Sequence, residues 1–130
     1  MTGLSGRLAT GRVFFVSKME DICYHPAAMT QFPVLIPDPI TSTTNAEVKS
    51  LRALHERKYR KKSGWFMAEG ARICREAVEL GWCMHRLAFL AGRENDAVMR
   101  PLLEGLATSG GRGLPMTEHL LQRISRKDNP

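Results

Sequence analysis

The sequence predicts an α/β fold, a three-layer sandwich in which a small, largely parallel sheet lies between helices on both faces. The first observation behind this prediction is an alternation of helix-like and strand-like segments over residues 40–125. Because helices separate the strands, we expect right-handed crossovers that cover both faces of the sheet. The second is the composition, with 43% hydrophobic and 25% charged residues, which is ordinary for a soluble globular protein. At 130 residues the chain holds one domain at most.

The first helix is expected to begin at Thr44. Thr44 can cap its first turn, and Glu47, three residues further on, can reach back to the Thr44 amide as a capping box requires. The apolar side of this helix would be formed by Val48, Leu51, Leu54 and His55. The cations of the segment point elsewhere, so the helix buries one side and leaves a basic side exposed. Ser63 and Gly64 end the segment.

A strand and a second helix follow. Residues 65–68 form a short apolar run between Gly64 and Gly70, which predicts a buried strand. Residues 70–80 have helical spacing, and Gly81 stands where a glycine commonly ends a helix.

The remaining elements repeat this alternation. Residues 84–90 predict a second strand, and residues 96–106 predict a helix that either begins next to Pro101 or is kinked there. Residues 113–116 predict a third strand, after which Thr117 caps a last helix. The apolar residues of that helix are Leu120, Leu121 and Ile124.

Residues 1–39 differ from this pattern, and we expect them to form a flexible or extended leader without regular packed structure. They hold four of the seven prolines and show no sustained periodicity. Residues 1–18 contain three cations and no acid, which resembles a weak organellar transit peptide. The alternatives are an unstructured leader or a segment upstream of a true start at Met29. A cytoplasmic location is the first expectation, and a mitochondrial location is the alternative.

The cysteines and the hydropathy argue against a disulfide-stabilised, a zinc-binding or a membrane-spanning protein. Cys23, Cys74 and Cys83 are odd in number and have no repeated spacing, so no disulfide framework or zinc pattern follows. His85 lies close to two of them, but we expect thiols in a reducing compartment and no metal site. No apolar run approaches the roughly 20 residues of a membrane helix, and we expect no membrane partner.

The strongest candidate site is the basic run, which we define as residues 49–62. It holds seven cations and one acid, a net charge of +6 that equals the formal charge of the whole chain. The remaining residues balance, with twelve basic and twelve acidic side chains. A local patch on an otherwise neutral chain indicates a site for a polyanion. The alternative is a basic surface that meets only solvent.

Several features of residues 40–82 occur together in one known family. They are the start Ile40-Thr41-Ser42, Asn45 before a short helix, the run Arg57-Lys58-Tyr59-Arg60, the strand end Glu69-Gly70, and the helix end Gly81-Trp82. As a set they resemble the substrate-binding domain of the SpoU/TrmH family of RNA ribose 2′-O-methyltransferases. The resemblance covers residues 40–130. Within it, residues 40–125 correspond to the RNA substrate-binding domain, and residues 126–130 resemble the start of the hinge to a catalytic domain.

The resemblance implies a fold similar to that of ribosomal proteins that bind kink-turn RNA. It also implies that the domain presents a ribosomal or transfer RNA to a catalytic domain that holds S-adenosylmethionine. In the family that cofactor lies in a knotted C-terminal (SPOUT) domain, with Gly-rich loops and a final motif containing Asn and Ser, and this sequence has no match to them. We therefore expect no catalytic residue, no cofactor and no activity in this chain alone. The fragment would be monomeric, and the intact enzyme a homodimer through its catalytic domain.

With the resemblance, the basic run is expected to bind RNA phosphates, because long cations can converge on a nucleic-acid backbone. The predicted RNA-binding residues are Lys49, Arg52, Arg57, Lys58, Tyr59, Arg60, Lys61 and Lys62. Tyr59 either stacks on an unpaired base or packs beneath the basic loop. Trp65 and Phe66 are expected in the core, and Glu69 is expected to pair with a basic residue such as Arg57 or Arg60. Two other functions fit the residues: a stand-alone kink-turn RNA binder, and a protein-interaction module whose basic patch meets an acidic partner.

Overall fold

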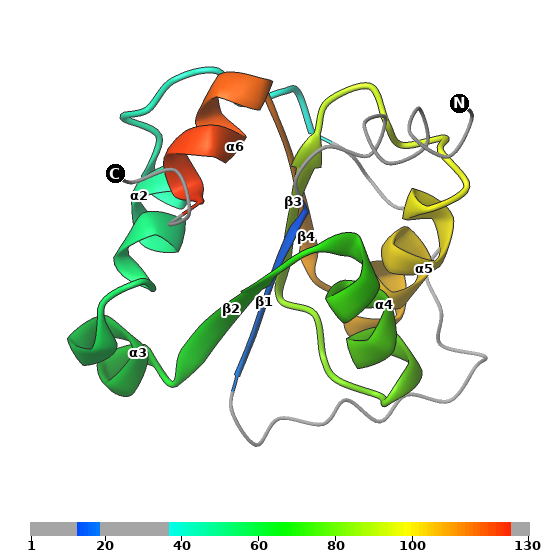
Figure 1. The fold of residues 1–130 in the computed structure, drawn as a ribbon, viewed down its shortest axis with the longest axis horizontal. Helices are drawn as coiled ribbons and strands as arrows, with labels where there is room; N and C mark the ends of the chain where they lie inside the picture. The colour runs from blue at the N-terminus through cyan, green and yellow to red at the C-terminus, as the bar shows by residue number, and fades with distance from the viewer. Residues whose placement is uncertain (1–12, 19–36, 126–130) are drawn as a thin grey trace.

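The computed structural model describes residues 13–18 and 37–125, which form a four-stranded sheet between two layers of helices (Figure 1). The strands are β1 (Phe14–Lys18), β2 (Trp65–Glu69), β3 (Arg86–Leu90) and β4 (Arg112–Met116). Their order in the sheet is β2-β1-β3-β4. β1 runs antiparallel to both of its neighbours, whereas β3 and β4 are parallel, so the sheet is mixed.

Five helices in the described part of the chain surround this sheet. They are α2 (Ala46–Ala53), α3 (Arg57–Ser63), α4 (Ala71–Glu79), α5 (Met99–Ser109) and α6 (Glu118–Ile124). α2 and α6 pack on one face, and α4 and α5 pack on the other, as Figure 1 shows. α3 continues from α2 beside the start of β2. The predicted α/β class, with helices on both faces, is confirmed.

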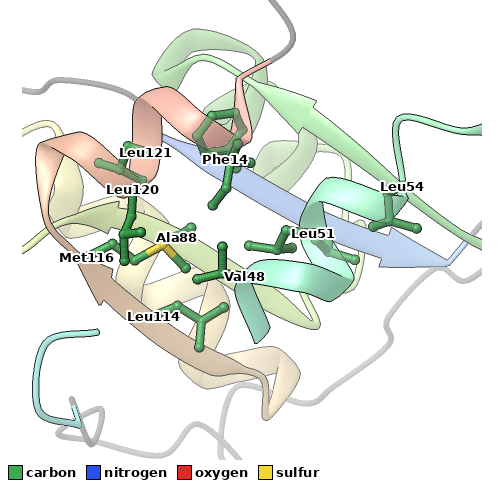
Figure 2. Packing of buried hydrophobic residues seen from close by; sticks show 11 residues of the cluster. Phe14, Val48, Leu51, Leu54, Ala88, Leu114, Met116, Leu120 and Leu121 are labelled. Carbon is green, nitrogen blue, oxygen red and sulfur yellow. The ribbon is translucent and has the colours of Figure 1, made fainter. Parts of the chain in front are cut away.

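Two apolar clusters fill the space between the sheet and its helices. The consecutive β1 residues Phe14 and Phe15 point into opposite clusters, because side chains alternate along a strand. Figure 2 shows the cluster under α2 and α6, where Leu51 and Leu120 pack with Phe14. Burying one such side chain fully stabilises the fold by about 1.5–3 kcal/mol. This cluster holds α2 in place and so positions the first cations of the basic run.

The prediction that residues 1–39 form a leader without packed structure is wrong for residues 13–18. β1 lies inside the sheet between β2 and β3, and residues 13–17 are all buried. Its Phe-Phe-Val start is apolar on both faces, so it lacks the alternation that marks a half-exposed strand. The other residues of the expected leader up to residue 36, and the expected hinge at residues 126–130, lie outside the described residues.

The prediction of a largely parallel sheet is also wrong, because it leaves out β1. β1 pairs with both neighbours in the antiparallel sense, and Phe14 stands opposite Glu69 on one side and Ala88 on the other. β3 and β4 keep the parallel arrangement that the alternating pattern predicts, with Arg86 beside Arg112. The inserted strand therefore makes the sheet mixed, while helices cover both of its faces as predicted.

The first predicted helical segment consists of two helices, α2 and α3, separated by residues 54–56. Asn45 is the N-cap of α2 in place of Thr44, because its Oδ1 accepts a hydrogen bond from the Glu47 amide at 2.7 Å. The predicted capping box is wrong, since the Glu47 side chain forms ion pairs with two arginines of the sheet.

The other predicted elements are confirmed with small shifts of their ends. Gly81 follows α4 with a left-handed φ of 86°. Pro101 lies in the first turn of α5, where a helix tolerates a missing amide hydrogen. Thr117 caps α6, and its hydroxyl accepts a hydrogen bond from the Leu120 amide at 3.3 Å. None of the helices described here is long and apolar enough to cross a membrane.

Candidate nucleic-acid interface

α2 presents the first two cations of the basic run on its solvent side. Val48 and Leu51 are buried against the sheet, whereas Lys49 and Arg52 are exposed. Residues three apart on a helix are neighbours on its surface. Lys49 and Arg52 therefore lie side by side, facing away from the core.

α3 consists mostly of cations, and none of its residues is buried. Its sequence, RKYRKKS, holds five cations and no acid. Arg57, Lys58, Lys61 and Lys62 are all exposed. Gly64 ends the helix in a left-handed conformation with φ of 77°. Residues with a side chain rarely adopt this conformation. α3 therefore projects a dense positive charge into solvent next to α2.

Arg60 is the cation of α3 that faces the protein. It is half-buried, and its Nη1 donates hydrogen bonds to the carbonyl oxygens of Leu54 and His55, both at 2.9 Å. The last carbonyls of a helix have no partner within that helix, and Arg60 satisfies two of them just beyond α2. The expected surface position of Arg60 is therefore wrong. Its assignment to RNA binding stays a prediction, as do those of the seven other residues.

Tyr59 lies on the exposed side of α3. Its side chain is 39% exposed, and the Lys58 ammonium nitrogen lies 5.2 Å from the centroid of its ring. A cation at this distance from a ring is attracted to its face. The ring also borders a pocket formed with α2, so Tyr59 combines exposure with a place at the wall of a cavity.

Two arginines that the sequence analysis missed extend the positive surface onto the sheet. Arg86 and Arg112 are the first residues of β3 and β4 and stand beside each other in the parallel register. Glu47 of α2 holds both, with Nε of Arg86 and Nη1 of Arg112 each 3.1 Å from one of its carboxylate oxygens. Only the register of two strands brings these arginines together, because Arg86 falls inside the predicted strand 84–90 and Arg112 lies one residue before the predicted strand 113–116.

A pocket of about 540 Å³, here called the first pocket, lies between α2, α3 and the starts of β2 and β3. Its lining residues are Glu47, Lys49, Ser50, Leu51, Ala53, Leu54, Tyr59, Lys62, Ser63, Trp65 and Arg86. Cations of three different elements, Lys49, Lys62 and Arg86, contribute to this lining. The basic run therefore surrounds a cavity as well as forming a convex surface.

The prediction that Trp65 is a core residue is only partly right. Trp65 also lines the first pocket. It is partly buried and packs against the cluster under α2 and α6. Its ring stacks with that of His85, with centroids 5.5 Å apart and planes 12° from parallel. The Arg86 guanidinium carbon lies 5.5 Å from the Trp65 centroid. Phe66, the next residue, packs in the opposite cluster as expected.

A second pocket of about 410 Å³ lies on the other side of α2, against α6. Its lining residues are Lys49, Arg52, Ala53, His55, Glu56, Arg123 and Ser125. Arg123 is a cation that the sequence analysis missed, because only the packing of α6 against α2 brings it beside Lys49 and Arg52. Lys49 borders both pockets. Lys49 therefore connects the two pockets across α2, and cations outnumber acids in the lining of each.

Glu69 lies at the end of β2, and its carboxylate contacts the end of α6. Both of its oxygens accept hydrogen bonds from the Ser125 hydroxyl, at 3.1 and 3.2 Å. We expected Glu69 to fix the basic loop. Its contact with Ser125 joins the end of β2 to the end of α6, and the pairing of Glu69 with a basic residue stays a prediction.

The described thiols are buried in the fold. Burial raises the pKa of the Cys74 thiol from its usual 9.0 to about 12, so this cysteine stays protonated at neutral pH. Cys83 is also buried. Within residues 13–18 and 37–125, no three side chains of His, Cys, Asp or Glu come together as metal ligands would.

The basic surface lies within the part of the chain that matches a known family. The family model of the MRM3-like substrate binding domain matches residues 45–130, from the N-cap of α2 onward. No curated protein and no solved structure matches the chain significantly. Since the matched region spans well over half of the sequence, the chain belongs to the MRM3-like substrate binding domain family.

Proposed function

We propose that this domain binds ribosomal or transfer RNA for an S-adenosylmethionine-dependent RNA ribose 2′-O-methyltransferase of the SpoU/TrmH type. One observation carries the proposal: the exposed cations of α2 and α3 form a positive surface in a chain of the MRM3-like substrate binding domain family. Phosphate contacts supply most of the sequence-independent affinity for nucleic acids. Cations on two adjoining helices can reach successive phosphates of one strand.

In this proposal the domain binds and orients RNA, and methyl transfer takes place in another domain of the enzyme. S-adenosylmethionine would supply the methyl group there, and the ribose 2′-hydroxyl would receive it. The residues of this chain that hold the RNA would be Lys49 and Arg52 on α2 and the exposed cations of α3. We expect this domain alone to be monomeric and without methyltransferase activity. The intact enzyme would form a homodimer through its catalytic domain.

The salt dependence of RNA affinity tests this function. Each phosphate contact contributes a slope of about −0.7 to −0.9 in a plot of log affinity against log salt concentration. If about four cations contact phosphates together, the total slope is about −3. Replacing the exposed residues Arg57 and Lys61 by alanine should reduce the slope by roughly 1.5 and weaken binding to many RNA sequences. Fluorescence anisotropy of a labelled RNA hairpin at several salt concentrations measures both quantities.

A matched control removes the same charge from the opposite face. Arg72 and Arg75 of α4 are exposed, and each lies near a glutamate one turn further on, Glu76 at 3.8 Å and Glu79 at 3.3 Å. We expect the double alanine variant of this pair to keep the RNA affinity and the slope. An equal loss in both variants would show a general charge effect. An unchanged slope in a folded Arg57→Ala, Lys61→Ala variant would favour the protein-interaction module with an acidic partner.

A further inference from the structure

We propose that the first pocket holds one unstacked nucleobase of the RNA, with the neighbouring phosphates on the cations at its rim. This base site rests on the proposed RNA-binding function and adds to it a place for a base. The volume of about 540 Å³ lies within the range of small-ligand pockets in proteins. The pocket is thus large enough for one nucleoside.

The lining of the pocket matches the two chemical parts of a nucleotide. Leu51, Leu54 and Trp65 supply apolar surface, and the first two are buried parts of the core. Lys49 and Lys62 are exposed at the rim. A base has apolar faces, and the phosphates on either side of it are anionic. An acidic peptide would match the interior only if it also carried a suitably placed apolar side chain, whereas every nucleotide combines a base with an anionic phosphate.

Two aromatic side chains from different elements line the same pocket. Trp65 of β2 is held by its stacking with His85 and by the Arg86 guanidinium near its ring. A wall that is already ordered lowers the entropy cost of binding. Among the Phe, Trp and Tyr side chains of the described segments, Tyr59 of α3 is the one that is exposed. Unpaired RNA bases are commonly held by stacking on such rings, whatever the base.

Arg86 is placed to contact the polar edge of a base. Its Nε donates to the Glu47 carboxylate at 3.1 Å, and its Nη1 donates to the His85 carbonyl at 2.8 Å. A guanidinium has five N–H donors, so these two bonds leave others for a carbonyl oxygen of the base. The Glu47 contact fixes the direction of the guanidinium and keeps it in the pocket wall.

Lys49 connects the base site to the rest of the positive surface. It lines both pockets, and the second pocket adds Arg52 and Arg123. A strand whose base occupies the first pocket can therefore cross α2 at Lys49 and place its next phosphates beside those arginines. In this arrangement the base site adjoins the cations that would contact the RNA backbone, and it is not an isolated cavity.

Fluorescence of Trp65 provides the test. Replacing Trp82 by phenylalanine leaves Trp65 as the sole tryptophan of the chain, which has two. Trp82 packs against Phe66 in the opposite cluster, so this variant leaves the pocket unchanged. Oligouridylate, whose bases stack weakly on one another, should change the Trp65 emission in a saturable way. Inorganic polyphosphate, a polyanion without bases, should bind without that change.

Variants at Tyr59 separate stacking from charge. Tyr59→Ala should weaken oligouridylate binding by about tenfold, the lower part of the range for one stacked base. The salt slope should stay the same, because Tyr59 neutralises no phosphate. Tyr59→Phe should keep most of the affinity, since the ring is retained. The Arg57→Ala, Lys61→Ala variant should lower the slope and keep the emission change at saturating RNA.

The possible results separate the two proposals. Unchanged affinity in Tyr59→Ala, together with an unresponsive Trp65 in a protein that still binds oligouridylate, would overturn the base site and leave RNA binding intact. The same emission change with polyphosphate would show that charge alone causes it, and would also overturn the base site. Absence of binding to both oligouridylate and RNA hairpins would overturn the proposed function itself.

Discussion

The helices on the two faces of the sheet both expose arginines, yet the two sets differ in their neighbours. On α4, Arg72 and Arg75 lie near Glu76 and Glu79, with nitrogen–oxygen distances of 3.8 and 3.3 Å. On α3, five cations are present and no acid. The charge of α4 is balanced within the helix, whereas the charge of α3 is available to an external anion. Local balance, more than the number of cations, identifies the face that can bind a polyanion.

The cavities of the two faces differ in the same sense. The first pocket, beside α2 and α3, includes Lys49, Lys62 and Arg86 in its lining. A smaller pocket of about 260 Å³ between α4 and α5 includes Glu104 and no cation. The packing there is close, since a Cβ atom on Gly105 would lie 2.7 Å from Val78 Cγ2. A phosphate would be attracted to the first pocket and repelled by the pocket between α4 and α5.

Removal of residues 1–18 should have the largest effect, because β1 lies between the two helix layers and supplies a phenylalanine to each apolar cluster. Losing one buried phenylalanine side chain typically costs about 3–5 kcal/mol, and a domain has only about 5–15 kcal/mol in total. We therefore expect the truncated chain to lose its cooperative thermal transition, measured by circular dichroism. Removal of residues 1–12 retains β1 and serves as the control. An unchanged melting temperature without residues 1–18 would restore the leader hypothesis.

Replacement of Arg60 by alanine should give the next largest effect, on stability. The variant leaves the carbonyl oxygens of Leu54 and His55 without the hydrogen bonds that Nη1 donates. Hydrogen bonds from charged groups contribute about 1.5–3 kcal/mol each. Because Arg60 is only half-buried and water can replace part of the lost bonding, we expect a total loss of about 2 kcal/mol in urea unfolding. Lys61→Ala, one residue along and exposed, should change the stability by less than about 0.5 kcal/mol. Equal stabilities of the two variants would show that Arg60 does not hold α3 to α2.

A smaller effect should follow from replacement of Glu47 by glutamine. Glu47 pairs with both Arg86 and Arg112, so removal of its charge should make both more available for phosphate contacts. We expect RNA affinity to rise severalfold and the salt slope to steepen by up to about 1. The cost in stability should stay below about 1 kcal/mol, because the glutamine can still accept hydrogen bonds. Glu76→Gln on α4 is the control and should leave affinity unchanged. An unchanged affinity and salt slope in Glu47→Gln would exclude these arginines from the interface, whereas a fall in affinity would show that Glu47 acts mainly by positioning Arg86.

The parts of the fold with a local signal could be predicted from the sequence. The apolar spacing around Cys74 and Ala77, the cap at Thr117 and the glycine after α4 depend on neighbours within a few residues. β1 could not be predicted in this way. It is only five residues long, it is buried on both faces, and its partners are about 50 and 70 residues away in the chain.

The candidate site likewise has residues that the sequence predicted and residues that only the structure brings together. A cluster of cations is visible in the sequence, and its exposure on α2 and α3 agrees with the expectation for every member except Arg60. The role of Arg60 depends on a break between the two helices that periodicity did not reveal. Arg86, Arg112 and Arg123 join the surface only through strand register and the packing of α6. Long-range geometry of this kind leaves no mark in a single sequence.

Amide chemical-shift mapping by NMR most directly tests the claim that RNA binds the face of α2 and α3. The isotope-labelled domain is titrated with an RNA hairpin, and the shift of every assigned amide is followed. The largest changes should fall on α2, on α3 and on the first residues of β2, β3 and β4, together with the Trp65 indole. α4 and α5 should change little. Changes concentrated on α4 and α5, or spread evenly over both faces, would contradict the claim.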